Sequence, residues 1–430
     1  MKWIFSIAVC ISLISSPAQG QQAELRFSAA SILPASVLQT DTYRIADPVS
    51  VSDHQFQFNI ETNYGTFPVT GIPMLEKRLS ELRAIQEAGK IGNQAVAVNS
   101  AWATLKRTPQ GAEHLLADPL GAFRQAPRGL RKMAANFADP VSRHAGSDAR
   151  RKLAANLGVD SETRNPVLSQ MLGQLAARDM VGRSATKFAL SAAIPGLGTL
   201  SSMEDLRDAV ASRSPHELLG QIDAELTQMG TWGPVKNAFV KSTNWTLLEK
   251  LTFMQSYKRL SGVEHSDVLL YQANRDGSEA EILRRLITVR LLAELHSKNP
   301  VQSLTDAGLP IAWLKDGQIV GVCSIDYLTS STEVQQVATG VRQNNPTKTI
   351  SLLSAGWVSP EAQSTLVKTG SNSFERTSQQ MQKSPISPIL KDHVDETTAC
   401  QWYSIDNGAL LPCTANRMSV AQTTPAGKPR

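Results

Sequence analysis

Residues 54–85, HQFQFNIETNYGTFPVTGIPMLEKRLSELRAI, contain two different hydrophobic periods, and the change from one to the other decides the fold class. In the first half apolar side chains alternate with polar ones, so that Phe56, Phe58 and Ile60 share one face of a strand. The turn NYG and the returning segment TFPVTG complete a β-hairpin. From Pro73 onward the leucines recur every three or four residues, which is the period of a helix. The sequence therefore predicts a β-hairpin followed directly by a helix.

Helical patterning continues from this point to about residue 298. The pairs Asn165-Pro166 and Ser214-Pro215 combine a capping side chain with a proline, and Ser278 begins the last long helix. The predicted loops are short, so neighbouring helices should pack antiparallel. We expect one domain over residues 48–300, made of the hairpin and a helical bundle.

A third pattern covers residues 301–377. The segment IAWLKDGQIVGVCSI predicts a second hairpin, in which Asp316-Gly317 would form a type I′ turn. A helix, a buried strand, a helix starting at Ser359-Pro360 and a short last strand follow, which is typical of a small α/β subdomain. The predicted fold class is thus α+β: mainly an α-helical bundle with an N-terminal β-hairpin and a small C-terminal α/β subdomain.

The first twenty residues have the pattern of a secretory signal peptide. Lys2 precedes the apolar run Trp3–Ile14, and Ala18-Gln19-Gly20 supplies small residues for cleavage. The run is shorter than the roughly 20 residues that a membrane anchor needs. We therefore expect an exported protein, periplasmic or extracellular, whose mature chain begins near Gln21 and whose residues 21–47 form a linker.

The last segment, residues 378–430, is rich in Ser, Thr, Gln and Pro and is expected to be flexible. Cys400 and Cys413 enclose twelve residues within it, and in an oxidising compartment they predict a disulfide worth about 3 kcal/mol. Cys323 lies in an apolar strand, so we expect a buried free thiol and not a nucleophile.

Positive charge is concentrated between residues 121 and 152, where eight Lys and Arg side chains face two Asp side chains. In this segment Phe123 lies among Arg124, Arg128, Arg131 and Lys132. Apolar side chains flanked by cations are typical of helices that lie on a membrane surface, so anionic lipid, lipopolysaccharide or an envelope protein is the expected partner. Two prolines interrupt the segment, and the alternative is a broken helix packed on the bundle. Nucleic acid is not an expected partner of an exported protein.

A serine acyl-enzyme is the enzymatic alternative. Ser184 and Lys187 form a Ser-x-x-Lys, and Ser242-Thr-Asn and Lys368-Thr-Gly follow it in the order of the penicillin-binding proteins and β-lactamases. Ser184 would then attack peptidoglycan peptides, with Lys187 as its base. In those enzymes, however, the third motif lies on a strand, whereas the segment before Lys368 has helical signals. Ordinary helix positions and caps are therefore the favoured interpretation of all four residues.

The sequence gives little support for a membrane span, a metal site or a cofactor site. The uncharged stretch of residues 188–203 is too short and too polar to span a membrane and predicts a buried helix with a Pro-Gly turn. The seven histidines are scattered singly, so no metal is expected. Neither a Gly-x-Ser-x-Gly elbow nor a phosphate-binding loop is present, and no cofactor is expected.

Two stretches, ETNYGTFPVTGIPMLEKRLSELRAI and LGVDSETRNPVLSQMLGQLA, resemble a group of exported bacterial proteins of unknown function. The positions that carry the resemblance are Tyr64–Phe67, Val69, Gly71, Met74, Leu75, Leu157–Val159 and Asn165–Leu168. The resemblance implies a shared architecture over residues 50 to about 375. It implies no activity and no catalytic residue. Together these observations favour a non-enzymatic cell-envelope protein.

Overall fold

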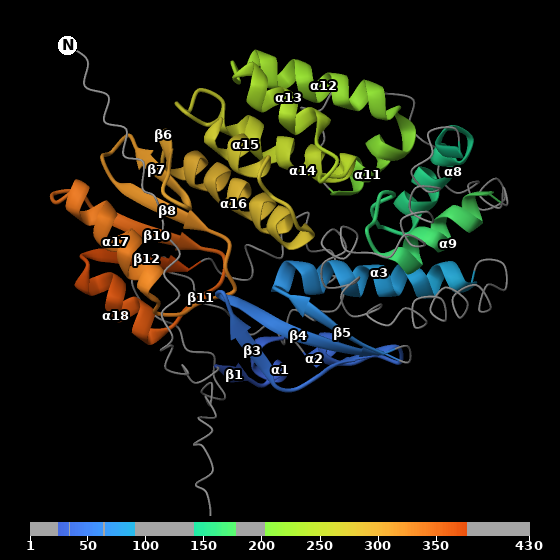
Figure 1. Cartoon of the computed structure of the whole chain (residues 1–430), viewed down its shortest axis with the longest axis horizontal. Helices are drawn as coiled ribbons and strands as arrows, with labels where there is room; N and C mark the ends of the chain where they lie inside the picture. The colour runs from blue at the N-terminus through green and yellow to red at the C-terminus, as the bar shows by residue number, and fades with distance from the viewer. Residues whose placement is uncertain (1–24, 34, 63–64, 91–141, 178–202, 376–430) are drawn as a thin grey trace, which may run out of the picture.

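The structure, a computed structural model, describes residues 25–33, 35–62, 65–90, 142–177 and 203–375. It has the predicted α+β class. An N-terminal sheet (blue), a helical domain (light blue to yellow) and a C-terminal α/β subdomain (orange) lie side by side (Figure 1). The signal peptide and the tail with Cys400 and Cys413 lie outside the described residues.

The predicted N-terminal hairpin is present and belongs to an antiparallel sheet, in which its first strand is central and its second strand is an edge. It consists of β4 (Gln55–Thr62) and β5 (Gly65–Thr70). The other edge of β4 pairs with β3 (Val49–Ser52) and β2 (Tyr43–Ile45), and β1 (Arg26–Phe27) pairs with β3. The alternating residues Phe56, Phe58 and Ile60 are buried, as their period predicts.

The prediction of a linker over residues 21–47 is wrong for the described part of that range. These residues form β1, α1 (Ala29–Ile32), α2 (Ala35–Leu38) and β2, and they bury Phe27, Ile32 and Ile45. Their apolar residues have no regular period, so no pattern marked them as structured. They fold because the free edges of β3 and β4 offer backbone hydrogen bonds to β1 and β2.

The helical domain begins with α3 (Ile72–Lys90), directly after the hairpin. The longer helices that follow are α8 (Ser142–Asn156), α9 (Pro166–Ala177), α11 (Met203–Ser212), α12 (Pro215–Gln228), α13 (Gly233–Lys241), α14 (Leu247–Tyr257) and α16 (Glu279–Lys298), with the short α15 (Val268–Ala273) before the last. The predicted caps are present: the Asn165 side chain accepts the N–H groups of Val167 and Leu168, and Ser278 forms a capping box with Glu281.

The C-terminal subdomain is a five-stranded sheet with the order β12-β10-β8-β7-β6. Its strands are β6 (Val301–Asp306), β7 (Pro310–Leu314), β8 (Ile319–Cys323), β10 (Ile350–Ser354) and β12 (Ser371–Glu375). Strands β8, β10 and β12 are parallel, while β6 and β7 are antiparallel. Helices α17 (Thr332–Asn344) and α18 (Pro360–Lys368) lie on one side of the sheet, and α16 contacts β8 on the side of the helical domain (Figure 1).

The turn between β7 and β8 is not the predicted type I′ turn. Gly317 has a φ of +88°, but Asp316 is not among the residues with positive φ, as type I′ would require. The Asp316 carboxylate instead accepts the backbone N–H of Gln318 and a side-chain N–H of Asn299. These bonds favour a longer loop with a single left-handed glycine.

Asp326 joins the C-terminal subdomain to the N-terminal sheet. Its Oδ2 accepts the backbone N–H groups of Phe56 and Ile72, both at 3.0 Å. In return, the backbone N–H groups of Asp326 and Tyr327 donate to the carbonyl of His54. Burial raises the pKa of Asp326 to about 7, against the usual 3.8. A residue that no sequence pattern singled out therefore holds two parts of the fold together.

We expect Asp326→Asn to flatten the dependence of stability on pH. The folded state holds the Asp326 proton more tightly than the unfolded chain, so this stabilisation is complete below about pH 4 and is lost as the pH rises to 7. Asn keeps the accepting oxygen but has no such proton. Thermal unfolding at pH 5 and pH 8 should show a smaller difference in Tm for the variant than for the wild type. Equal differences would contradict this assignment.

Candidate functional site

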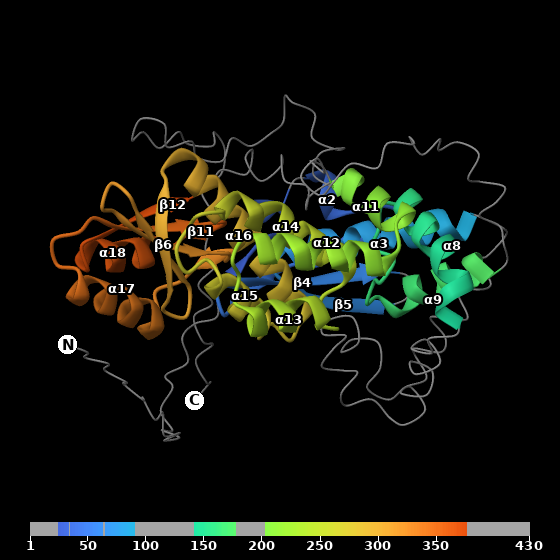
Figure 2. The ribbon, with the colours of Figure 1, turned by 90° about the horizontal axis from the view of Figure 1, so that it is seen from above.

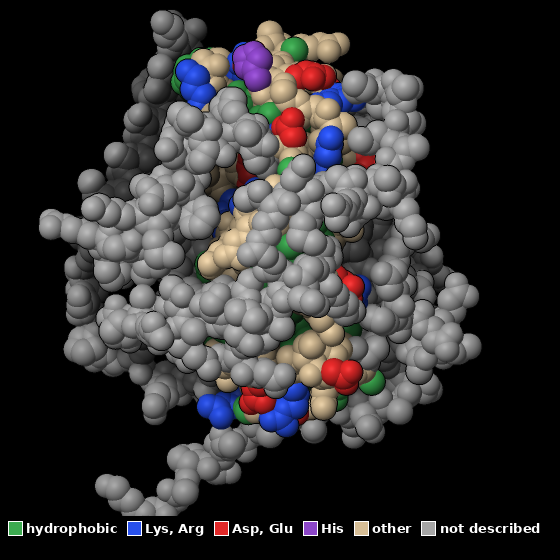
Figure 3. All heavy atoms as spheres, turned by 90° about the vertical axis from the view of Figure 1, so that its right-hand side faces the viewer, with side chains coloured by type: hydrophobic (Ala, Val, Ile, Leu, Met, Phe, Trp, Pro, Cys, Tyr) green, Lys and Arg blue, Asp and Glu red, His purple; other side chains and the backbone are tan. Residues whose placement is uncertain are grey.

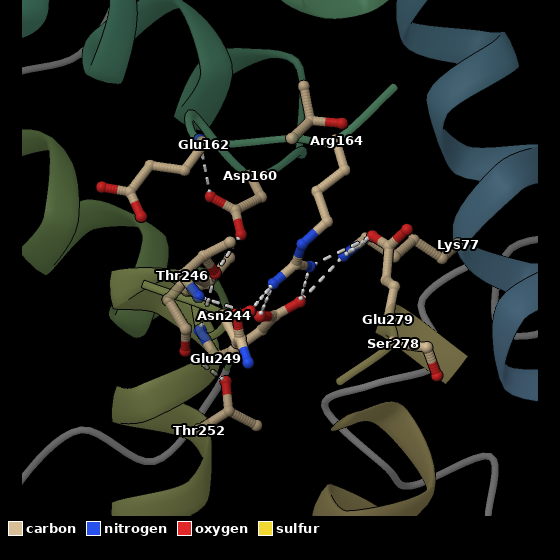
Figure 4. A network of polar contacts seen from close by, with 12 residues as sticks. Lys77, Asp160, Glu162, Arg164, Asn244, Thr246, Glu249, Thr252, Ser278 and Glu279 are labelled. Atoms are coloured by element: carbon tan, nitrogen blue, oxygen red, sulfur yellow. Dashed lines mark hydrogen bonds and ion pairs between the residues drawn. The ribbon is translucent and has the colours of Figure 1, made fainter. Parts of the chain in front are cut away.

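The densest cluster of charged side chains in the described residues lies inside the helical domain (Figure 4). Four segments supply it: α3, the connection between α8 and α9, and the N-terminal ends of α14 and α16. They carry the cations Lys77, Arg78 and Arg164 and the carboxylates Glu81, Asp160, Glu162, Glu249 and Glu279. We call this cluster the ion-pair network.

Arg164, from the α8–α9 connection, is at the centre of the network. Its guanidinium forms two parallel hydrogen bonds with Glu249, Nη1 to Oε1 at 2.7 Å and Nη2 to Oε2 at 2.8 Å. Both side chains are largely withdrawn from water, at 9% and 5% exposure. Nη2 also donates to the backbone carbonyl of Asn244, and Nη1 lies 3.4 Å from a Glu279 oxygen. This two-point pairing is the strongest form of contact between Arg and a carboxylate.

Glu279 connects α16 to α3. Its Oε1 lies 2.6 Å from Nζ of Lys77, and its Oε2 lies 2.6 Å from Nη2 of Arg78. Lys77 also lies 3.1 Å from Glu249 of α14. Arg78 contacts Glu81, three residues along α3, at 2.6 Å. The three cations therefore each bridge carboxylates on more than one residue, and three separate helices share the same charges.

The α8–α9 connection is tied to its neighbours by side-chain hydrogen bonds. The Thr163 hydroxyl donates to Glu81 at 2.6 Å, and the Asn165 amide donates to the same carboxylate at 3.2 Å. The Thr246 hydroxyl, at the cap of α14, donates to Asp160 at 2.5 Å. The Glu162 carboxylate accepts the N–H of the first residue of α14 at 2.9 Å. An anion at a helix N-terminus is stabilised there by the helix dipole.

Local sequence explains why the connection takes this path. Gly158 has a φ of +70° and follows α8, and the N–H groups of Gly158 and Val159 donate to carbonyls of the last turn of the helix. This is the usual way in which a left-handed glycine ends a helix. Asn165-Pro166 then starts α9. Six residues between these two signals thus carry acidic, hydroxyl and basic side chains into the space between the helices.

Burial alone would raise the pKa of Glu249, but Lys77 and Arg164 outweigh burial and hold it at about 2. The same balance, with Arg78 as the foremost cation, lowers the pKa of Glu279. For Asp160 and Glu162 burial dominates and their pKa values are raised. Glu249 and Glu279 are therefore ionised and paired at neutral pH, which suits a role in holding helices together better than a role in proton transfer.

A small cavity lies beside the network, with Lys77, Asp160 and Arg207 in its wall. Its volume is about 90 Å³, well below the several hundred Å³ of sites that bind organic molecules. In the described residues no group of three or more His, Cys, Asp or Glu side chains could hold a metal ion.

The residues of the serine acyl-enzyme alternative are only partly described. Ser184 and Lys187 lie outside the described residues. Ser242 follows the last residue of α13, and its hydroxyl accepts the N–H of Asn244. Lys368 is the last residue of α18, an exposed helix position and not a strand position. Helix α13 belongs to the helical domain and α18 to the C-terminal subdomain (Figures 1 and 2), so these two residues do not share one site.

The other predicted site residues are those of the basic segment and the cysteines. Phe123, Arg124, Arg128, Arg131 and Lys132 lie outside the described residues, as do Cys400 and Cys413. Cys323 is a free thiol on β8, and it is half-buried where a fully buried side chain was expected. Burial raises the pKa of its thiol to about 12, so it is not a nucleophile at neutral pH.

Sequence reasoning did not identify the ion-pair network, although both of its main segments had been singled out. Lys77, Arg78 and Glu81 lie in the first stretch that carries the family resemblance, and Asp160–Asn165 lies in the second. Because charged residues on a helix usually face water, these residues were expected on the surface. The signal was the density of charge within segments that are otherwise apolar.

Comparison of the chain with protein-family models, with curated proteins and with solved structures gives no significant match. Its function is therefore argued from its own residues.

We expect Arg164→Ala to lower the free energy of unfolding by about 3–5 kcal/mol, because it removes the two-point partner of the buried Glu249 and leaves an excess of negative charge in the core. The matched control is Arg44→Ala, which removes an exposed pair with Glu61 of similar length and should cost less than about 1 kcal/mol. Urea unfolding measures both. Similar small losses for the two variants would show that the network contributes little to stability.

Proposed function

We propose that the protein is an exported, non-enzymatic cell-envelope protein that docks on an anionic membrane surface. The docking element is the basic segment with Phe123, Arg124, Arg128, Arg131 and Lys132. The observation that supports this most is where that segment joins the described fold. In the sequence the segment lies between α3 and α8. These two helices belong to one firmly connected group.

The helices in this group are α3, α8, α9 and α11. Helix α9 packs on α3 and on α8, and α11 packs on α8. Arg150 of α8 donates to the carbonyls of Ser161 and Ser169, so α8 is bonded both to the connection and to α9. Seen from above, the group lies at the end of the molecule away from the C-terminal sheet (Figure 2).

The basic segment itself combines an apolar side chain, Phe123, with the cations Arg124, Arg128, Arg131 and Lys132. This combination is what interfacial binding needs, because apolar side chains enter the headgroup layer while cations pair with lipid phosphates. Each cation near an anionic surface adds about 1 kcal/mol.

The described surface at the α8–α9 end of the molecule carries both positive and negative side chains. Viewed toward α8 and α9 (Figure 3), the described Lys and Arg side chains alternate with Asp and Glu. Any electrostatic attraction would therefore come from the basic segment and not from the frame. Among the described helices, none combines the length and the apolar character needed to cross a bilayer.

Vesicle flotation tests the proposal. At low salt the mature protein should float with vesicles that contain phosphatidylglycerol and not with neutral phosphatidylcholine vesicles, and added salt should release it. The variant with Arg124, Arg128, Arg131 and Lys132 changed to Ala should bind at least about tenfold more weakly.

The matched control removes four exposed lysines elsewhere on the molecule: Lys241, Lys298, Lys315 and Lys348. It has the same net charge as the test variant and should float like the wild type. A wild type that stays at the bottom of the gradient, or a control that loses binding equally, would end the proposal of a specific basic docking segment.

Export has a separate test. In a bacterial host with a periplasm, we expect the mature protein in the periplasmic or secreted fraction, with an N-terminus near Gln21 and a Cys400–Cys413 disulfide. Peptide mass spectrometry without reduction measures both. A cytoplasmic protein that keeps residues 1–20 would contradict export without bearing on the vesicle result.

A further inference from the structure

A second, larger cavity lies in the C-terminal subdomain, between its sheet and α17. Its volume is about 310 Å³, which is within the range of sites that bind small organic molecules. Ile311, Gly321 and Leu352 line it from the sheet, and Val334 and Val337 line it from α17. This cavity is distant from the ion-pair network and from the frame of the proposed docking segment (Figure 2).

The packing around this cavity is unusual for a protein core. Of all residues in α17 only Ala338 is buried, although Val334, Val337 and Val341 all face the cavity and are only half-buried. On this side of the sheet the apolar residues form two small clusters, separate from the main core. Protein interiors are normally filled to the density of organic crystals. The mostly apolar lining leaves room for an apolar guest, which would be withdrawn from water on binding.

Two residues that line the cavity, Ser351 and Ser371, have a hydroxyl without a hydrogen bond among the described residues. Ser351 alternates with Ile350 and Leu352 along β10, so its side chain projects from the other face of the sheet. Ser371 is 3% exposed, and among the described residues its hydroxyl has no partner. Ser371 is paired with Ile350 in the parallel ladder, so both side chains project from the cavity side of the sheet. A buried hydroxyl without a partner reduces stability, and an oxygen atom on a bound molecule would relieve that cost.

The charges around the cavity argue against an anionic ligand. No Lys or Arg is among the described residues that line it, whereas Glu333 is. The other titratable groups in the wall are neutral. Thr329 donates its backbone N–H to Nδ1 of His54, and burial lowers the pKa of this histidine. The Cys323 thiol keeps its proton. A carboxylate or phosphate in the cavity would find a like charge and no counter-ion.

We propose that this cavity binds a neutral, largely apolar molecule whose single hydroxyl or carbonyl oxygen bonds to Ser371. The cavity has room for about ten non-hydrogen atoms, since each takes up about as much space as a water molecule in the liquid. A medium-chain alcohol has the right size, shape and polarity. This site goes beyond the proposed docking function and does not depend on it.

The test uses the full mature protein and the neutral fluorescent probe 1-naphthylamine, whose size matches the cavity. The probe should bind with increased fluorescence, and 1-decanol should displace it at a concentration at least about tenfold lower than decanoate. Val337→Trp fills the cavity and should weaken probe binding at least about tenfold. Gln336→Trp adds the same bulk at an exposed neighbouring position and should leave binding unchanged.

Ser371→Ala separates the hydrogen bond from general apolar binding. It should weaken 1-decanol about 3- to 10-fold, as expected for one lost hydrogen bond, and leave decane unchanged. Its Tm should not fall, because the hydroxyl has no partner to lose. If Val337→Trp does not fold by circular dichroism, Val334→Phe replaces it.

Three outcomes would overturn the proposal: no probe binding, equal binding in the cavity-filled variant, or decanoate bound as tightly as 1-decanol. An unchanged affinity of Ser371→Ala for 1-decanol would overturn the role of Ser371.

Discussion

The fold depends on a buried set of ion pairs that no single helix could hold. Arg164 lies between Glu249 and Glu279, and Lys77 and Arg78 approach the same carboxylates from α3. Taking such charges out of water costs several kcal/mol for each ion, and only close geometry with several partners offsets that cost. The helices are therefore held in one arrangement, because any displacement would leave an unpaired charge in the core.

This constraint explains how the parts of the molecule are related. The network connects α3 to the α8–α9 connection and to the N-terminal ends of α14 and α16, while Asp326 connects the N-terminal sheet to the C-terminal subdomain. The main hydrophobic cluster contains residues from Phe27 to Ala355 and so includes side chains of all three parts of the fold. The segment proposed to dock on membrane is attached to the rigid end, whereas the loosely packed side of the C-terminal sheet has room for a ligand.

Much of this fold follows from the sequence, and its site does not. The hairpin at Phe56, the capped helices at Asn165 and Ser278, and the C-terminal α/β subdomain follow from periodicity and capping, which are local properties. The network, Asp326 and the cavity depend on which segments meet in space. Residues 26–45 were mistaken for a linker for the same reason, because their strands exist only as partners of β3 and β4.

The central claim is that the network acts as one unit, and a double-mutant cycle tests it most directly. In the described part of the chain Glu81 and Glu249 share no direct hydrogen bond or ion pair. They are connected through Arg78, Glu279 and Lys77, and through the α8–α9 connection, where Arg164 lies between two residues that bond to Glu81. The free energies of unfolding of Glu81→Gln, Glu249→Gln and the double variant give their coupling. The account predicts a coupling above about 0.5 kcal/mol, and additivity within about 0.3 kcal/mol would contradict it.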